Sequence, residues 1–78
     1  MAVLRLFGPA REAAGVAGVE IPGRSVAEVL GSAEERFGKA FAEVVAVSRI
    51  WVNGRSATGE ALVGEGDEVA VIPPVSGG

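Results

Sequence analysis

The sequence predicts an α+β fold in which one main helix packs across a small mixed sheet. A length of 78 residues indicates a single domain with a small core. The apolar residues are mostly alanine and valine, and valine favours strands. Only residues 25–38 combine a helical spacing of apolar side chains with signals for a helix start and end, and strand-like segments lie on both sides. Two strands, one helix and two further strands in this order are typical of an α+β layer.

The first two strands are predicted over residues 2–7 and 18–21, where short apolar runs end at glycine and proline. In the first run, Leu4 and Leu6 share one face of the strand. Residues 10–15 between the two runs are helix formers, but they are too few for more than a turn or two. We therefore expect the second strand to return beside the first, as in a hairpin.

The main helix is predicted to begin after Ser25 and to end at Gly38. Ser25 is a good N-cap residue, and Glu28 three positions later completes a capping box. Gly38 supplies a helix stop. Five apolar residues form one stripe at helical spacing, which we expect to face the sheet: Val26, Val29, Leu30, Ala33 and Phe37.

The last two strands are predicted over residues 48–52 and 66–72. Residues 41–54 begin without a clear pattern and become strand-like toward their end, where Asn53 and Gly54 predict a tight turn. The bulky residues that are the main candidates for the core are Leu4, Leu6, Ile21, Leu30, Phe37, Phe41, Ile50, Leu62 and Ile72.

The composition excludes most familiar catalytic and binding chemistry. Because the chain has neither cysteine nor histidine, it lacks disulfides, thiolate and imidazole metal ligands, and the usual general base. A net charge of −3 without a run of Lys or Arg argues against nucleic-acid binding. No apolar stretch is long enough for a signal peptide or a membrane span, so we expect a cytoplasmic protein that does not bind membranes.

No enzyme motif is found either. Residues 64–66 contain two glycines but lack the lysine and the following helix of a phosphate-binding loop. Asp67 and Glu68 are adjacent, and adjacent side chains on a strand point to opposite faces, so they are interpreted as turn and surface residues. Ser76 has no histidine to activate it. We therefore expect no bound cofactor and no metal.

Residues 73–78, with the sequence PPVSGG, are interpreted as an extended tail on a domain formed by residues 1–72. Because prolines fix φ and favour extended backbone, the tail is expected to project from the last strand. Gly77 and Gly78 have no Cβ, so they form a thread thin enough for a narrow active site. The α-carboxylate of Gly78 is ionised at neutral pH and is unreactive until it is activated. It is the one distinctive reactive group of the sequence.

Four segments of the chain carry a resemblance to a known family: LFGPAREAAG, SVAEVL, VNG and GDEVAVIPPVSGG. They resemble the ubiquitin-like sulfur carriers, and most specifically the small subunits of molybdopterin synthases. The resemblance implies a β-grasp fold, in which the first and last strands lie side by side and parallel. It also implies that an ATP-dependent activating enzyme adenylates Gly78 and that a sulfur donor converts the acyl-adenylate to a thiocarboxylate.

In this family the tail enters the large subunit of the synthase, which supplies the catalytic pocket for sulfur transfer to precursor Z. The resemblance therefore implies a heterotetramer of two small and two large subunits, in which the small subunit supplies sulfur and no catalytic groups of its own. It assigns contacts with partner proteins to Arg11, to Ile72 on an exposed sheet face, and to the inserted arm of Pro73, Pro74, Val75, Ser76 and Gly77.

Arg11 and Trp51 each have two interpretations. Arg11 matches a family arginine near the partner interface, and an ordinary solvent-exposed helix arginine is an equal alternative. Trp51 is interpreted as a core residue, with a place on the docking face as the alternative, because tryptophan is enriched at interfaces.

Three other functions compete with the first. The thiocarboxylate could serve thiamine, cysteine or tRNA thiolation, although the double proline before the tail favours molybdopterin synthase. The chain could instead be a ubiquitin-like protein modifier, and its single lysine, Lys39, then disfavours elaborate chains of the modifier. The last alternative is an inert binding domain with a flexible tail.

Overall fold

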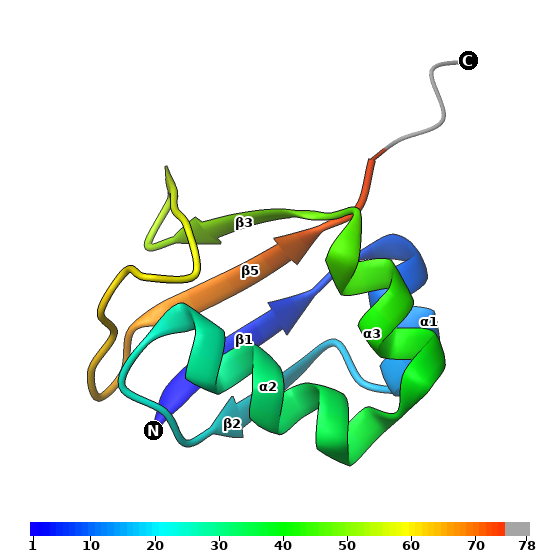
Figure 1. Ribbon diagram of the computed structural model, residues 1–78, viewed down its shortest axis with the longest axis horizontal. Helices are drawn as coiled ribbons and strands as arrows, with labels where there is room; N and C mark the ends of the chain where they lie inside the picture. The colour runs from blue at the N-terminus through cyan, green and yellow to red at the C-terminus, as the bar shows by residue number, and fades with distance from the viewer. Residues whose placement is uncertain (75–78) are drawn as a thin grey trace.

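The computed structural model describes residues 1–74, and within them it contains one five-stranded mixed sheet with helices on one face (Figure 1). The strands, in the order β2-β1-β5-β3-β4 across the sheet, are β1 (Ala2–Leu6), β2 (Gly18–Ile21), β3 (Arg49–Val52), β4 (Arg55–Ser56) and β5 (Glu68–Ile72). The helices are α1 (Gly8–Ala14), α2 (Val26–Phe37) and α3 (Lys39–Ala46). This arrangement confirms the predicted α+β class with α2 as the main helix across the sheet.

The two middle strands, β1 and β5, are parallel, whereas β2 and β3 pair antiparallel with them. The register places Leu4 opposite Val69 and Leu6 opposite Val71, and all four side chains are buried under the helices. The first and last strands therefore lie side by side as the resemblance implied. The buried apolar residues of the core are Ala2, Leu4, Leu6, Ala10, Ile21, Val26, Val29, Ala33, Phe41, Val45, Val63, Val69 and Val71.

Helix α2 begins and ends where the sequence predicts. The Oγ atom of Ser25 accepts a hydrogen bond from the backbone N–H of Glu28 at 3.2 Å, which satisfies one of the unpaired donors of the first turn. The Glu28 carboxylate accepts from the backbone N–H of Arg24 at 3.0 Å, one residue before the expected partner of a capping box. The helix ends at Gly38, whose φ of 96° is unfavourable for other residues.

Helix α3 occupies the segment that the sequence pattern left without a clear assignment. Phe41 and Val45, four residues apart, are buried on one face of this helix. The ring of Phe41 also meets that of Phe37 edge to face, with the centroids 5.2 Å apart. These contacts hold a valine-rich segment in a helical conformation.

The structure confirms the predicted tight turn but not two of the predicted core residues. The turn is confirmed, since Asn53 and Gly54 have φ values of 49° and 83° and connect β3 to the short strand β4. The prediction that Leu62 and Ile72 belong to the core was wrong, because these side chains are 81% and 37% exposed. None of the helices formed by residues 1–74 has the length and apolar character that crossing a membrane requires.

Candidate functional site: the end of the sheet that leads into the tail

The chain leaves the sheet at the carboxyl end of β5, close to where β1 ends and β3 begins (Figure 1). The register pairs Val71 with Leu6 of β1 and Ile72 with Arg49 of β3. Of the two prolines that follow, Pro73 is buried and Pro74 is exposed. We call this end of the sheet, from Val71 to Pro74 with its neighbours on β1 and β3, the tail outlet.

Four predicted site residues lie outside the described residues: Val75, Ser76, Gly77 and Gly78. Their assigned roles, including that of the Gly78 carboxylate, remain predictions. Within the described part of the tail, the side chain of Pro73 already packs against the domain, so Pro74 is the proline that is open to a partner.

The side chains opposite the core form a second face of the sheet, which we call the outer face. Successive side chains of a strand point to opposite faces, so the residues that alternate with buried Leu4, Val69 and Val71 lie there. The outer-face residues of the three middle strands are Val3, Arg5, Glu68, Ala70, Ile72, Arg49 and Trp51.

Trp51 corrects one interpretation of the sequence. The residues before and after it, Ile50 and Val52, pack against the core, so the Trp51 side chain lies on the outer face. It is half-buried and pairs in register with Ala70 of β5. The preferred interpretation of Trp51 as a core residue was therefore wrong. The side chain lies on the face that the alternative requires, and contact with a partner there stays a prediction.

Three exposed apolar side chains lie at or beside the tail outlet. Ile72 is 37% exposed on the outer face, which agrees with its predicted position on an exposed sheet face. Phe7 continues β1 in extended backbone, with φ −130° and ψ 151°, so its side chain lies on the face opposite to Leu6 and is 48% exposed. Val47, two residues before β3, is 65% exposed. Phe7 and Val47 were missed because their spacing from Ile72 along the chain gives no signal. The pairing of Leu6 with Val71 and of Arg49 with Ile72 places the segments that carry them at this end of the sheet.

The charges of the outer face are unevenly compensated. The Nε–H of Arg5 donates to the Glu68 carboxylate at 2.9 Å. Arg49 is exposed, and no carboxylate of residues 1–74 lies within ion-pair distance of it. The positive charge nearest to Ile72 in the register is therefore one that these residues leave uncompensated.

Arg11 lies on α1, which begins directly after β1 and so starts at the same end of the sheet as the tail outlet. Its side chain is exposed, while its backbone carbonyl accepts a hydrogen bond from the N–H of Gly15 at 2.8 Å. The fold thus brings Arg11 and Ile72 to one end of the molecule. The role of the Arg11 side chain stays a prediction.

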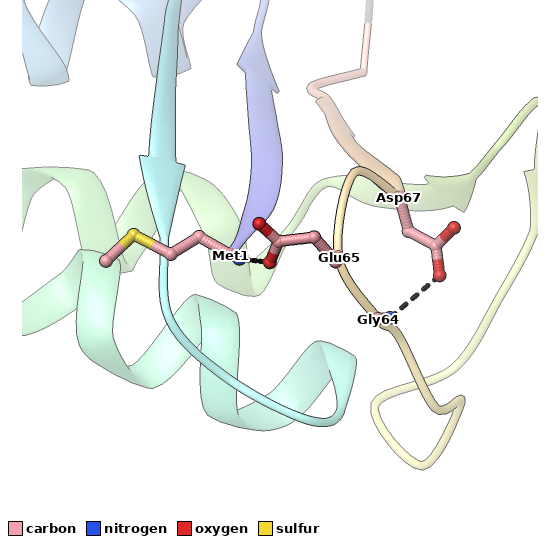
Figure 2. A network of polar contacts seen from close by, with 4 residues as sticks. All are labelled: Met1, Gly64, Glu65 and Asp67. Carbon is pink, nitrogen blue, oxygen red and sulfur yellow. Dashed lines mark hydrogen bonds and ion pairs between the residues drawn. The ribbon is translucent and has the colours of Figure 1, made fainter.

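At the opposite end of the sheet, where β1 and β5 begin, polar contacts join the loop before β5 to its neighbours (Figure 2). The Asp67 carboxylate accepts hydrogen bonds from the backbone N–H of Gly64 at 2.8 Å and from the side-chain amide of Asn53 at 3.1 Å. These two donors, the first above all, hold the pKa of Asp67 below its ordinary value, although slight desolvation opposes them. The terminal ammonium group of Met1 pairs with Glu65. Asp67 is therefore a turn residue, as the sequence predicts.

Other places for a ligand lie away from the tail outlet. An open groove of about 450 Å³ lies between the end of β2 and α2, and it is lined by Pro22, Gly23, Glu28, Gly31, Ser32 and Glu35. No predicted site residue lines it. Within residues 1–74, no three acidic side chains come together in an arrangement that could hold a metal ion.

The fold and the tail outlet define the class of the protein. A mixed sheet with parallel middle strands, a main helix packed across one face and a final middle strand that leads into the tail together form the ubiquitin-like β-grasp fold. The model of the ThiS family matches residues 4–78. The chain therefore belongs to the ThiS family, a family of ubiquitin-like sulfur carriers.

Solved structures of the same fold carry several names. Small archaeal modifier protein 1 from Methanosarcina acetivorans is 28% identical to this chain, with a TM-score of 0.88 over 99% of this chain and 95% of the other. A protein from Pyrococcus furiosus named after subunit 1 of molybdopterin converting factor is 30% identical, with a TM-score of 0.78 over 95% and 97%. A chain of the BexX/CysO complex of Amycolatopsis orientalis is 25% identical, with a TM-score of 0.85 over all of both chains.

Proposed function

We propose that the chain is the sulfur-carrier small subunit of a molybdopterin synthase. An activating enzyme uses ATP to adenylate the Gly78 carboxylate, with release of pyrophosphate. A sulfur donor then replaces the adenylate, so that AMP leaves and Gly78 carries a thiocarboxylate. The large subunit transfers this sulfur to precursor Z, and the carrier returns to be loaded again. We expect this cycle in the cytoplasm, without a cofactor bound to the carrier itself.

The observation that carries this proposal is the direct connection between the middle strand β5 and the tail. A partner can bind the apolar outer face around Ile72 and Trp51 while the tail enters its active site. Residues 73–78 span at most about 20 Å when extended, which is enough to reach into a narrow pocket. The carrier then needs no catalytic groups, because the partner supplies the acid and base chemistry.

The outer face and a related complex both support a partner protein. A chain of the BexX/CysO complex shares this fold over its full length, which supports a partner protein for this chain. We propose the large subunit of the synthase and the activating enzyme as partners, with Ile72, Arg11 and Pro74 among the contacts. The resulting synthase is a heterotetramer of two small and two large subunits.

Two sequence similarities bear on which pathway uses the sulfur. The 30% identity to a protein named after molybdopterin converting factor subunit 1 favours molybdopterin synthesis, as does the PPVSGG tail. The 28% identity to a small archaeal modifier protein supports a second function, in which activated Gly78 is joined to lysines of other proteins. The two functions share activation and differ in the acceptor.

The test offers one loaded carrier to both kinds of acceptor. Thiocarboxylated protein is incubated with the large subunit and precursor Z, and in a parallel reaction with activating enzyme, ATP and a lysine-containing protein extract. We expect sulfur to appear in the dithiolene of molybdopterin and the carrier mass to return to that of the carboxylate. A loaded carrier that keeps its sulfur with the large subunit and forms conjugates in the extract would establish the modifier function instead.

A further inference from the structure

The two outer-face arginines of the middle strands differ in their electrostatic surroundings. Arg5 is neutralised by Glu68, and both side chains are about half exposed, at 53% and 48%. Arg49 lies opposite Ile72 in the register of β3 and β5, and no carboxylate within residues 1–74 comes within 4.0 Å of its side-chain nitrogens. Although the net charge of the chain is −3, residues 1–74 leave this cation at the base of the tail uncompensated.

The surroundings of Arg49 are those of an interface residue. Ile72 beside it is exposed, and Trp51 follows two positions later on the same face of β3. Arginine and tryptophan are enriched among the residues that dominate binding energy. A partner that covers this apolar surface removes water from the guanidinium group, so it must offer hydrogen-bond acceptors or lose affinity, and a carboxylate compensates the positive charge best.

Arg49 lies too far from Gly78 to take part in the chemistry. Six residues, 73–78, separate the base of the tail from the reacting carboxylate, and they extend to about 20 Å when the tail is threaded into an active site. This is longer than an arginine side chain, so the guanidinium group does not contact the adenylate. Arg49 therefore acts as a positioning residue on the surface of the partner protein.

We propose that the activating enzyme recognises the base of the tail through an ion pair between one of its carboxylates and Arg49. The inference depends on the proposed function only in requiring that Gly78 is adenylated. The Gly78 carboxylate and ATP are both anions and repel each other, so the activating enzyme must hold the tail through contacts away from the reacting atoms. An uncompensated cation beside an apolar side chain provides such a contact.

The experiment compares charge reversals at two exposed arginines of the same hairpin. Pyrophosphate release by the activating enzyme is measured against carrier concentration for the wild type, Arg49→Glu, Arg49→Gln, Arg49→Lys and the control Arg55→Glu. Arg55 lies on β4, in register with Val52 at the far end of β3 from the tail outlet. Arg49→Glu should raise KM at least about tenfold and leave kcat unchanged. Arg49→Gln should show a smaller rise, Arg49→Lys should retain most of the affinity, and Arg55→Glu should match the wild type.

Thermal unfolding of each variant checks that the fold is intact, and Arg49→Gln replaces Arg49→Glu if the charge reversal fails to fold. Three results would overturn the inference: equal KM for Arg49→Glu and Arg55→Glu, a loss confined to kcat, or an effect seen only in transfer from the loaded carrier to the acceptor subunit. If the wild type itself releases no pyrophosphate with a competent enzyme, the proposed function fails as well. If the wild type is activated normally and Arg49→Glu has the KM of the wild type, only the role of Arg49 is refuted.

Discussion

At Gly23 the chain passes from β2 toward α2 with φ of 154°, and an added Cβ would lie 2.8 Å from both the Cγ2 and the backbone N of Val29. Gly31 in the middle of α2 is the opposite case. It has an ordinary φ, and an added Cβ would meet nothing within 4 Å. The same substitution should therefore have opposite effects at these two glycines.

We expect Gly23→Ala to lower the free energy of unfolding by about 1–3 kcal/mol, because the backbone strain and the close contact both persist. Gly31→Ala should raise it by about 0.5–1 kcal/mol, because alanine loses less conformational freedom in a helix. Urea denaturation of both variants measures these changes. Equal stability of the two variants would contradict the described path of the chain at Gly23.

The hydrogen bonds of Asp67 predict a dependence of stability on pH. Because Gly64 and Asn53 lower the folded-state pKa of Asp67 below its unfolded value, the ionised carboxylate stabilises the fold. This contribution is fully present above the unfolded pKa of about 3.9 and is lost as the pH falls through the lower folded-state pKa.

Asp67→Asn should therefore be less stable than the wild type near neutral pH, and the difference should shrink as the solution is acidified below about pH 4. Urea midpoints of both proteins across this pH range provide the measurement. A stability difference that stays constant or grows on acidification would show that the Asp67 charge does not stabilise the turn.

Among the elements, α2 could be predicted from sequence to the residue because its signals are local. Ser25 caps its first turn, Gly38 ends it, and the apolar stripe between them faces the sheet. Ser25→Ala should cost about 1 kcal/mol of unfolding free energy. The control is Ser32→Ala inside the same helix, which should be neutral or slightly stabilising because alanine favours helix. Chemical denaturation of the two variants distinguishes them, and an equal loss for both would assign no special role to the cap.

Helix α3 could not be predicted in the same way, because its stability comes from contacts between distant residues. Val44 and Val45 favour strands locally, but the packing of Phe41 and Val45 into the core stabilises the helix and outweighs this preference. The arrangement of residues on the outer face could not be predicted fully for the same reason. The position of Ile72 follows from alternation along β5, but the places of Trp51, Phe7 and Arg49 beside it follow only from the pairing of β5 with β1 and β3.

At the scale of the whole molecule, the two ends of the parallel strands differ in the residues that surround them. At one end, contacts of Asp67 and of Met1 join the loop before β5 to the rest of the sheet. At the other end lie exposed apolar side chains of the outer face and Arg49, which pairs with no carboxylate in the described part of the chain. All helices of residues 1–74 pack on the core side of the sheet, so a partner can cover the outer face without disturbing the core (Figure 1).

This separation predicts that function can be removed at the tail without loss of the fold. Deletion of Gly78, or extension of the chain beyond it, should abolish sulfur loading and leave the urea midpoint unchanged, because the apolar core cluster of the described residues 1–74 ends at Val71. Unfolding of either variant, or normal loading of the extended chain, would contradict a carrier that reacts through its terminal carboxylate.

The most direct test of this mechanism is the intact mass of the protein after incubation with ATP, its activating enzyme and a sulfur source. We expect a mass increase equal to the replacement of one oxygen by sulfur, dependent on ATP and absent from the variant without Gly78. An unchanged mass for the wild type, with an activating enzyme shown to be competent on another carrier, would contradict the central claim that Gly78 carries sulfur.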